Sequence, residues 1–248
     1  MGDSVAGLAL AAGAGTRLWP LTRLLPKPLC PVGGVPLIDQ AVQRLHAAVG
    51  DVAVNVHHGR ALIEGHLAGT AHLSVEEEMP LGTAGALGLL RPWLAGRAVL
   101  VVNSDTWCEA DLGTFVTGWD GERTRILRLG DAALGPRSTI VASLMPWPVV
   151  AELPPEPAGL YERVWGPAYE AGLVELVRFH GAVIDCGTPA RYLEANMRSS
   201  GGESVVPESA VVFGEVERTV LWPGAVVEKG ETLRNAIRTH TAMTVLVR

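Results

Sequence analysis

The chain is poor in cysteine and in aromatic residues, and it has no excess of positive charge. Only three of its 248 residues are cysteines, and Cys30, Cys108 and Cys186 lie too far apart to form a C-x-x-C pair. This spacing gives no zinc motif or disulfide framework, and it favours free thiols in a reducing compartment. Lysine and arginine number 20 against 26 acidic residues, a net charge of −6. That balance argues against nucleic acid as a partner, because nucleic-acid binders normally carry a basic face.

Long hydrophobic runs are also absent. Although 48% of the residues are hydrophobic, no stretch reaches the roughly 20 apolar residues of a membrane-spanning helix. The N-terminal stretch has no basic region followed by a cleavage site. We therefore expect a cytoplasmic protein with no membrane partner, long enough for one α/β domain and a small appendage.

Strand and helix signals alternate through the first half of the chain, which predicts βαβ units. The fold class that we expect is α/β, with a Rossmann-like, mixed but mostly parallel sheet flanked by helices. The most hydrophobic predicted strand, residues 98–103, should lie centrally. Ligands of such sheets bind outside the carboxyl ends of the strands.

The turn after the first predicted strand, residues 5–12, has the features of a phosphate site. Gly13 and Gly15 place no Cβ atom in the way of a polyanion and can adopt positive φ. Free N–H groups of such a turn can point at phosphate oxygens. The turn is neither a P-loop nor a G-x-G-x-x-G fingerprint. The predicted nucleotide contacts here are Leu10, Ala11, Ala12, Gly13, Ala14, Gly15 and Thr16.

Four charged residues carry the predicted chemistry. Arg17 and Lys27 follow the turn and would neutralise charge on a triphosphate. Asp105 and Asp185 each follow an apolar strand, and converging carboxylates suit Mg²⁺, which typically takes one or two of them with phosphate oxygens. For each aspartate the alternative is a helix N-cap.

The string G-x-G-T-R at 13–17, followed by P-K-P at 26–28, resembles the sugar-1-phosphate nucleotidylyltransferases, also called sugar-nucleotide pyrophosphorylases. Asp105 and Asp185 match the aspartates of the family's Asn-Gly-Asp and Asp-x-Gly-Thr-Pro motifs, with Ser104 in place of the usual glycine. The resemblance implies the nucleotide-diphospho-sugar transferase fold, a Mg²⁺ cofactor on the two aspartates, and the two cations as catalytic residues.

The resemblance also assigns the segment 76–85, Glu-Glu-Glu-Met-Pro-Leu-Gly-Thr-Ala-Gly, to the base and ribose, and this string looks most like guanylyl- and glucose-1-phosphate-type members. It implies further nucleotide contacts at Glu77, Gly82, Thr83, Gly85 and Ser104. Alternatively, the glutamates form only a solvated turn. Gly82 and Gly85 would allow a ligand to approach the backbone closely.

The resemblance weakens after residue 129, where the family's Glu-Lys-Pro and Asn-x-Gly acceptor motifs are missing. Arg128, Arg137 or Arg178 could supply the missing cation, and the sequence does not choose among them. The sequence does not decide whether the acceptor is a sugar 1-phosphate or a smaller phosphorylated alcohol. It does not identify the nucleobase either.

We therefore expect an enzyme that transfers NMP from an NTP to a phosphorylated acceptor and releases pyrophosphate. The alternatives are a non-catalytic regulatory homologue and a scaffold. The four intact charged residues argue against the first alternative, since a dead enzyme has no chemical need for them. The short tail weakens the second.

The composition changes at Ser199-Ser200-Gly201-Gly202. We predict a catalytic domain at 1–198, a linker at 199–204 and a short left-handed β-helix-like segment at 205–248. Small apolar residues recur there at roughly six-residue intervals. So few coils would not be stable alone, so the segment should pack on the main domain or support a homo-oligomer. An irregular β tail is the alternative.

Overall fold

The computed structural model describes residues 5–247, which divide into two compact units. Of these residues, unit 1 holds 5–14, 40–104 and 108–183, and unit 2 holds 15–39, 105–107 and 184–247. The junctions do not follow the predicted linker at 199–204, because the tail shares a hydrophobic core with the segment after the glycine turn. Among the described residues, no helix has the length and apolar composition that crossing a bilayer requires.

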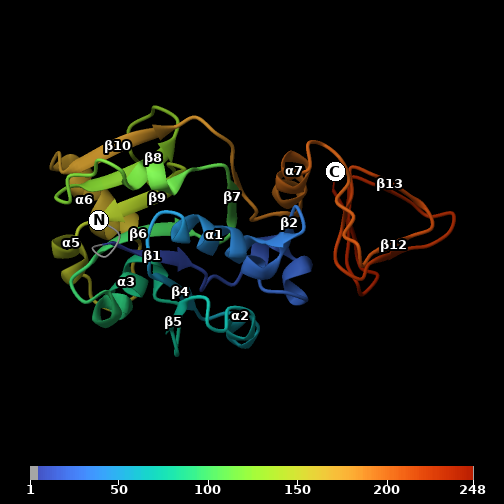
Figure 1. The fold of residues 1–248 in the computed structure, drawn as a ribbon, viewed down its shortest axis with the longest axis horizontal. Helices are drawn as coiled ribbons and strands as arrows, with labels where there is room; N and C mark the ends of the chain where they lie inside the picture. The colour runs from blue at the N-terminus through green and yellow to red at the C-terminus, as the bar shows by residue number, and fades with distance from the viewer. Residues whose placement is uncertain (1–4, 248) are drawn as a thin grey trace. The chain divides into compact units, whose positions relative to one another are not determined.

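Unit 1 is built on a seven-stranded sheet of order β10-β8-β9-β6-β1-β4-β5. Its strands are β1 (Val5–Leu10), β4 (Val52–Val56), β5 (His72–Val75), β6 (Ala98–Asn103), β8 (Thr124–Leu129), β9 (Ile140–Met145) and β10 (Val174–Phe179). Only β9 runs antiparallel to its neighbours, β6 and β8, so the predicted mixed, mostly parallel sheet is confirmed (Figure 1). The hydrophobic β6 is the middle strand, as expected.

Helices connect and cover these strands. They are α2 (Arg60–His66), α3 (Gly82–Leu94), α4 (Leu112–Val116), α5 (Trp147–Ala151), a π-helical turn (Tyr161–Trp165) and α6 (Gly166–Glu170), while α1 (Leu37–His46) continues from unit 2 into unit 1. Helix α3 buries Ala84, Leu87, Leu90 and Leu94 against strand residues such as Leu8. These positions recur every three or four residues, which places them on one face of the helix.

Unit 2 begins with three short 3-10 turns, Thr16–Leu18, Leu21–Arg23 and Lys27–Leu29, that the sequence did not indicate. Its other elements are β2 (Pro31–Val32) and β3 (Val35–Pro36), the pair β7 (Thr106–Cys108) and β11 (Val183–Asp185), and α7 (Pro189–Ser199). The core gathers Leu18 and Leu21 of the turns, Tyr192 of α7 and Trp222 of the tail. The indole of Trp222 donates to Tyr192 Oη at 3.1 Å, so turns, helix and tail form one packed unit.

The tail consists of short strands that pair in parallel across one coil. The pairs are β12 (Val211–Val212) with β15 (Val226–Val227), β13 (Glu215–Glu217) with β16 (Thr232–Arg234), and β14 (Val220–Leu221) with β17 (Ala236–Arg238), and β18 (Thr244–Leu246) adds an antiparallel strand. The predicted periodic residues Val216, Val227 and Leu233 pack inside this segment. The apolar period therefore identified its inward positions.

Candidate functional site

The four charged residues predicted from the sequence meet within unit 2. Lys27 Nζ lies 2.7 Å from Asp105 Oδ2 and 2.9 Å from Asp185 Oδ1. Arg17 Nη2 lies 3.4 Å from Asp185 Oδ2. The Lys27 side chain is 5% exposed, whereas those of Asp105 and Asp185 are 37% and 52% exposed. One buried ammonium thus holds two carboxylates that still face solvent.

Local structure explains why these side chains converge. Lys27 opens a 3-10 turn between two prolines, whose rings fix φ and stiffen the backbone on both sides. Asp185 is the last residue of β11, and Asp105 directly precedes β7, its partner strand. The N–H of Cys186 donates to the carbonyl of Asp105 at 3.1 Å. This bond ties the two aspartate-bearing segments together beside the lysine.

The ion pairs shift two pKa values in opposite directions. Burial alone would lower the pKa of Lys27, but the charges of Asp105 and Asp185 and hydrogen bonds to them raise it above its ordinary value of 10.5. Partial burial would raise the pKa of Asp185, but the hydrogen bond and charge of Lys27, aided by Arg17, hold it below 3.8. Both groups are therefore charged at neutral pH.

Glycines allow the charged side chains to approach one another. Gly15 has φ +63°, and a Cβ atom there would lie 2.9 Å from the Cβ of Lys27. A Cβ on Gly187 would lie 3.0 Å from both Arg17 Nη2 and Asp185 Oδ1. Larger residues at either position would push the cations out of place.

Gly13 differs from what the sequence predicts for it. Its φ is not positive, and no atom lies within 4 Å of a Cβ built on it. The chain itself therefore does not require a glycine at this position. Open space beside a glycine is what close approach of a ligand to the backbone needs.

Asp105 and Asp185 fit the donor chemistry of Mg²⁺. Both offer hard carboxylate oxygens to one cationic group, and Mg²⁺ typically binds one or two carboxylates together with phosphate oxygens and water. Within residues 5–247, no group of three or more His, Cys, Asp or Glu side chains gathers as a metal site. Two protein ligands match a site that substrate phosphates complete.

A buried polar network supports the glycine turn in unit 1. The N–H of Ala11 donates to Asn55 Oδ1, Asn55 Nδ2 donates to Glu76 Oε1, and the N–H of Leu81 donates to Glu76 Oε2, each at 2.7 Å. Asn55 is 3% exposed and Glu76 is 2% exposed. Glu76 is therefore not part of a solvated turn, which corrects one of the two readings of the glutamate run. Glu77 is 72% exposed and pairs with Arg60 at 2.9 Å.

The glycines of α3 face the chain's own backbone. A Cβ on Gly82 would lie 2.5 Å from the carbonyl oxygen of Ala158, and one on Gly85 would lie 2.2 Å from that of Glu156. The hydroxyl of Thr83 accepts a hydrogen bond from the N–H of Leu160 at 2.7 Å. Gly82 and Gly85 therefore let segment 154–160 approach the backbone of α3, where the sequence predicted that a ligand would do so. The nucleotide contacts of Gly82, Thr83 and Gly85 stay predictions, without that reason for them.

Comparison with known proteins identifies the chain's N-terminal half. Residues 6–127 match the family model described as Nucleotidyl transferase. This half is a nucleotidyl transferase domain. The prediction of the sugar-1-phosphate nucleotidylyltransferase family from the glycine turn and its cations is confirmed.

Relatives of the nucleotidyl transferase domain are enzymes by name. The mannose-1-phosphate guanyltransferase of Pichia angusta is 40% identical over 131 residues, 48% of this chain and 36% of that protein. The enzyme of the same name in Schizosaccharomyces pombe is 28% identical over 90% of this chain and 72% of its own. The N-acetylmuramate alpha-1-phosphate uridylyltransferase of Caulobacter vibrioides is 38% identical over 47% of this chain and 53% of its own.

A solved structure shares the fold. A Bacillus anthracis protein, described as a glucose-1-phosphate thymidylyltransferase, superposes with a TM-score of 0.66 at 20% identity, over 79% of this chain and 95% of that one. Since this chain spans only about a third to a half of two of the three enzymes above, its own activity does not follow from their names.

Ser104, where the nucleotidyl transferase family usually has glycine, turns its side chain inward. Its hydroxyl donates to the carbonyl of Leu10 at 2.7 Å, its N–H donates to the same oxygen at 3.1 Å, and the residue is 0% exposed. The serine fastens the end of β6 to the end of β1. Because the hydroxyl is already bonded, the predicted contact of Ser104 with the nucleotide would have to come from its backbone, and it stays a prediction.

Two of the three arginines considered for the acceptor phosphate are engaged elsewhere. Arg128 is buried and donates to the carbonyl of Ala132. Arg178 pairs with Asp131 at 2.8 Å. Arg137 is exposed and forms no ion pair among the described residues. Of the three arginines, Arg137 is therefore the one whose guanidinium is not already engaged within residues 5–247.

Proposed function

We propose that the chain is a Mg²⁺-dependent nucleotidyltransferase, which transfers NMP from an NTP to a phosphorylated small-molecule acceptor and releases pyrophosphate. The observation that carries the proposal is the cluster of Lys27 with Asp105 and Asp185, flanked by Arg17. Separate stretches of the chain contribute these groups, and nothing in packing alone requires two half-exposed carboxylates around a buried ammonium.

The proposed reaction needs positioning and positive charge more than proton transfer. An acceptor phosphate oxygen attacks the α-phosphorus in line, a new P–O bond forms, and the bond to the departing pyrophosphate breaks. The acceptor is already an anion, so it needs no general base. Arg17 and Lys27 would neutralise the charge that develops on the phosphates. An ammonium has three donors, and two of those of Lys27 are assigned, which leaves one for a phosphate oxygen.

The proposed Mg²⁺ ligands are Asp105 and Asp185. The metal would supply charge neutralisation and a template for the phosphates. The chain's own part is to hold the two carboxylates beside Lys27, through the strand pair β7–β11 and the hydrogen bond from Cys186 to Asp105.

The proposed acceptor is a sugar 1-phosphate. Support comes from the relatives, whose names give mannose 1-phosphate and N-acetylmuramate 1-phosphate as acceptors. Arg137 is the proposed cation for the acceptor phosphate, in place of the family's Glu-Lys-Pro lysine. Its substitution by alanine should raise the KM of the acceptor and leave that of the NTP unchanged.

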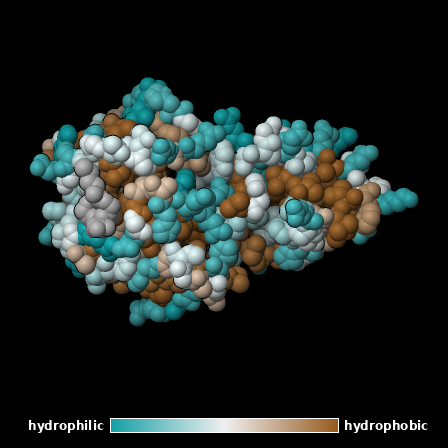
Figure 2. All heavy atoms as spheres, viewed as in Figure 1, coloured by the Kyte–Doolittle hydropathy of each residue, from teal (hydrophilic) through white to brown (hydrophobic). Residues whose placement is uncertain are grey.

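We also propose that the tail is β-helix-like, that the chain self-associates through it, and that the protein is cytoplasmic. Strand partners 15 and 17 residues apart support a β-helix-like tail, at Val211↔Val226 and Val220↔Ile237. The exposed Val211 and Phe213 support self-association through the tail, whose drawn face carries hydrophobic residues (Figure 2). Three free thiols support a cytoplasmic location.

The test is pyrophosphate release from each NTP, with Mg²⁺ and a panel of phosphorylated acceptors. Asp105→Asn and Asp185→Asn should each lower turnover by about 100-fold or more, because each removes a charge from the reacting phosphates' site. The matched control is Asp51→Asn, which removes an exposed surface ion pair with Arg97 and should leave turnover unchanged. NTP binding without release for every acceptor would favour a regulatory homologue.

A further inference from the structure

We propose that His58 is a positioning residue of the NTP site, whose ring orients the backbone of the glycine turn so that the N–H of Gly13 points at a phosphate. This inference rests on the proposed function and adds a residue that belongs neither to the sequence motifs nor to the charged cluster. The ring nitrogen Nδ1 of His58 lies 3.0 Å from the carbonyl oxygen of Ala12. His58, Ala12 and Gly13 all belong to unit 1.

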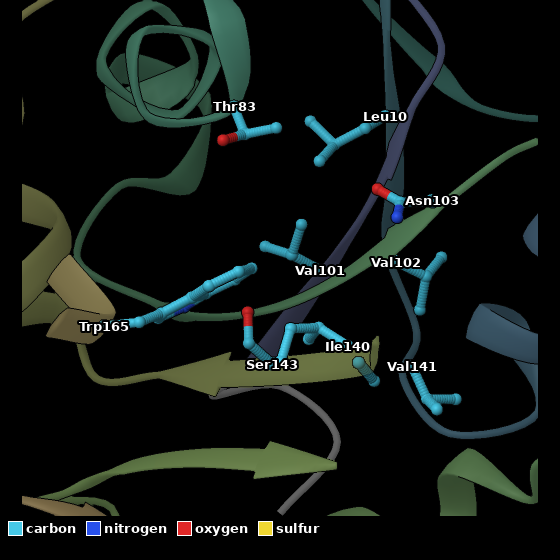
Figure 3. Close-up of a pocket in the computed structure, with 10 residues that line it drawn as sticks. Leu10, Thr83, Val101, Val102, Asn103, Ile140, Val141, Ser143 and Trp165 are labelled. Atoms are coloured by element: carbon cyan, nitrogen blue, oxygen red, sulfur yellow. The ribbon is translucent and has the colours of Figure 1, made fainter. Parts of the chain in front are cut away.

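His58 lies at the edge of the sheet where ligands of this fold class bind. It follows the carboxyl end of β4, which pairs in parallel with β1, and it precedes α2, which begins at Arg60. Ligands of open α/β sheets bind outside the carboxyl ends of the strands. Leu10 and Asn103, the last residues of β1 and β6, are partners at the same edge (Figure 3). The ring is therefore placed beside the turn that follows β1.

The hydrogen bond between His58 and Ala12 has only one possible direction. A carbonyl oxygen accepts hydrogen bonds and cannot donate them, so Nδ1 of His58 must carry the proton. The ring of His57 packs edge to face against that of His58, with centroids 4.7 Å apart. His57 is itself fixed, because its Nδ1 lies 2.7 Å from the carbonyl oxygen of Glu76. Although His58 is exposed, two contacts thus determine the orientation of its ring.

The bond to Ala12 also determines where the N–H of Gly13 points. The peptide between the two residues is trans, and in a planar trans peptide the C=O and the N–H point in opposite directions. Since the carbonyl is held toward His58, the N–H of Gly13 is turned away from the ring. This N–H makes no hydrogen bond to the residues that the structure describes, and Gly13 is exposed. It is therefore free to donate to a phosphate oxygen.

The Leu10–Ala11 peptide of the same turn is bonded at both ends. The carbonyl of Leu10 accepts from the hydroxyl of Ser104 at 2.7 Å and from its N–H at 3.1 Å. The N–H of Ala11 donates to Asn55 Oδ1 at 2.7 Å, so it has nothing left for a ligand. The Ala12–Gly13 peptide differs in that its carbonyl is held while its N–H stays available.

This difference matters for an anion. A carbonyl oxygen carries partial negative charge, so a peptide that turned the oxygen of Ala12 toward a phosphate would repel it, whereas N–H groups of a turn attract it. By holding the carbonyl, His58 excludes the repulsive orientation before the NTP arrives. Less of the binding free energy is then spent on ordering the turn.

The test uses inorganic triphosphate with Mg²⁺ as the probe, because it carries neither base nor sugar. Its binding to the whole chain is followed by the backbone ¹H–¹⁵N signal of Gly13, which should shift to saturation. His58→Ala should weaken the binding by about tenfold, the size of one lost hydrogen bond. His58→Asn should restore most of the affinity, because the asparagine amide N–H can donate to the same carbonyl. All variants should keep the melting temperature of the native chain, since His58 is exposed.

His46→Ala is the matched control. His46 also bonds a backbone carbonyl through a ring nitrogen, from Nε2 to Thr70 at 3.2 Å. Thr70 precedes β5, which runs parallel to β4, so this bond lies at the opposite edge of the sheet. The control should bind triphosphate as the native chain does.

A Gly13 signal that the probe leaves unmoved, or equal affinities of the native chain and His58→Ala, would overturn the inference. So would a His58→Asn variant no better than alanine, because the ring would then act by its bulk and not by its N–H. In turnover, His58→Ala should raise the KM of the NTP and leave that of the acceptor unchanged. A chain that binds triphosphate through His58 and Gly13 but releases no pyrophosphate with any acceptor would refute the proposed function and leave His58 assigned.

Discussion

Lys27 is the residue on which the candidate site depends most, since its ammonium lies between two carboxylates. Replacing it with methionine keeps most of the side-chain volume but leaves Asp105 and Asp185 to repel each other. Turnover should fall by about 100-fold or more. Stability should fall by about 1–2 kcal/mol, less than for a fully buried pair because both carboxylates are half-exposed.

Steady-state pyrophosphate release and urea denaturation measure these two effects. Lys229→Met, at an exposed lysine of the tail, is the control and should change neither quantity. Native turnover in Lys27→Met would remove Lys27 from the catalytic residues.

The opposite pKa shifts of Asp185 and Lys27 predict the pH range over which their ion pair adds stability. The lowered pKa of Asp185 means that its contribution is present above pH 3.8 and disappears as pH falls through the lowered pKa. The raised pKa of Lys27 means that its contribution is present below pH 10.5 and disappears as pH rises through the raised pKa.

The free energy of unfolding of the native chain should therefore exceed that of Asp185→Asn by a constant amount between those two pH values. The difference should be no more than about 1 kcal/mol, because half of the carboxylate is exposed. Denaturation at several pH values measures it. A difference that persists well below pH 3.8 would show that the asparagine acts by some means other than lost charge.

Among single residues, the sequence predicted the charged residues of the site well, but it did not predict the residues that hold the glycine turn in place. Arg17, Lys27, Asp105 and Asp185 follow recognisable motifs, and the structure brings them together. Asn55 belongs to no motif and lies inside an apolar strand, so nothing but the fold reveals that it meets Glu76.

Among the elements, β1, β4 and the loop before α3 are joined by the Asn55–Glu76 network. Asn55→Ala would leave Glu76 Oε1 and the N–H of Ala11 without their partners, while Glu76 Oε2 keeps the N–H of Leu81, at a cost of about 2–4 kcal/mol. Glu76→Gln keeps one acceptor and should cost less, while Glu78→Gln, at an exposed position, should cost nothing. Thermal unfolding ranks the three variants.

Asn55→Ala should also raise the KM of the NTP, since the released N–H of Ala11 belongs to the predicted phosphate turn. An unchanged KM would show that the network only stabilises the fold.

Helix α3 and segment 154–158 lie so close together that only glycine fits between them. Gly85→Ala would place a methyl group 2.2 Å from the carbonyl oxygen of Glu156, so the helix or the segment must move. Stability should fall by about 1–3 kcal/mol, the usual cost of overpacking. Gly65→Ala in α2 meets no atom within 4 Å and should be neutral or slightly stabilising, since alanine favours helix. Equal melting temperatures for the two variants would contradict the close packing.

Element positions were more predictable than element contacts. Apolar periodicity located most strands and helices of unit 1, because each buries one face or both. It could not show whether a glycine approaches a ligand or another backbone, and at Gly82 and Gly85 the partner is backbone. The 3-10 turns around Arg17 and Lys27 were missed because three-residue turns have no period to detect.

In the whole molecule, the tail is an integral part of the unit that carries the charged cluster. Trp222 and Val220 are 1% exposed, Ile237 is fully buried, and all three share a core with Leu18 and Leu21. The sequence predicted a linker at 199–204 because the Ser-Gly stretch has the composition of one, and it left open whether the tail packs on the main domain or on another subunit. Composition cannot show that residues beyond such a stretch fold back onto earlier turns.

Ending the chain after residue 204 should therefore unfold unit 2 locally, including the turns that hold Arg17 and Lys27. Loss of Trp222 alone removes one of the largest fully buried side chains and the hydrogen bond to Tyr192, and such a truncation to alanine costs about 3–5 kcal/mol. The shortened chain should show a lower melting temperature and lose NTP binding in the presence of Mg²⁺. Phe213→Ser is the control, because this tail residue is 67% exposed and should leave both properties intact. A shortened chain that melts and binds NTP like the native one would show that the tail contributes nothing to the fold of the charged cluster.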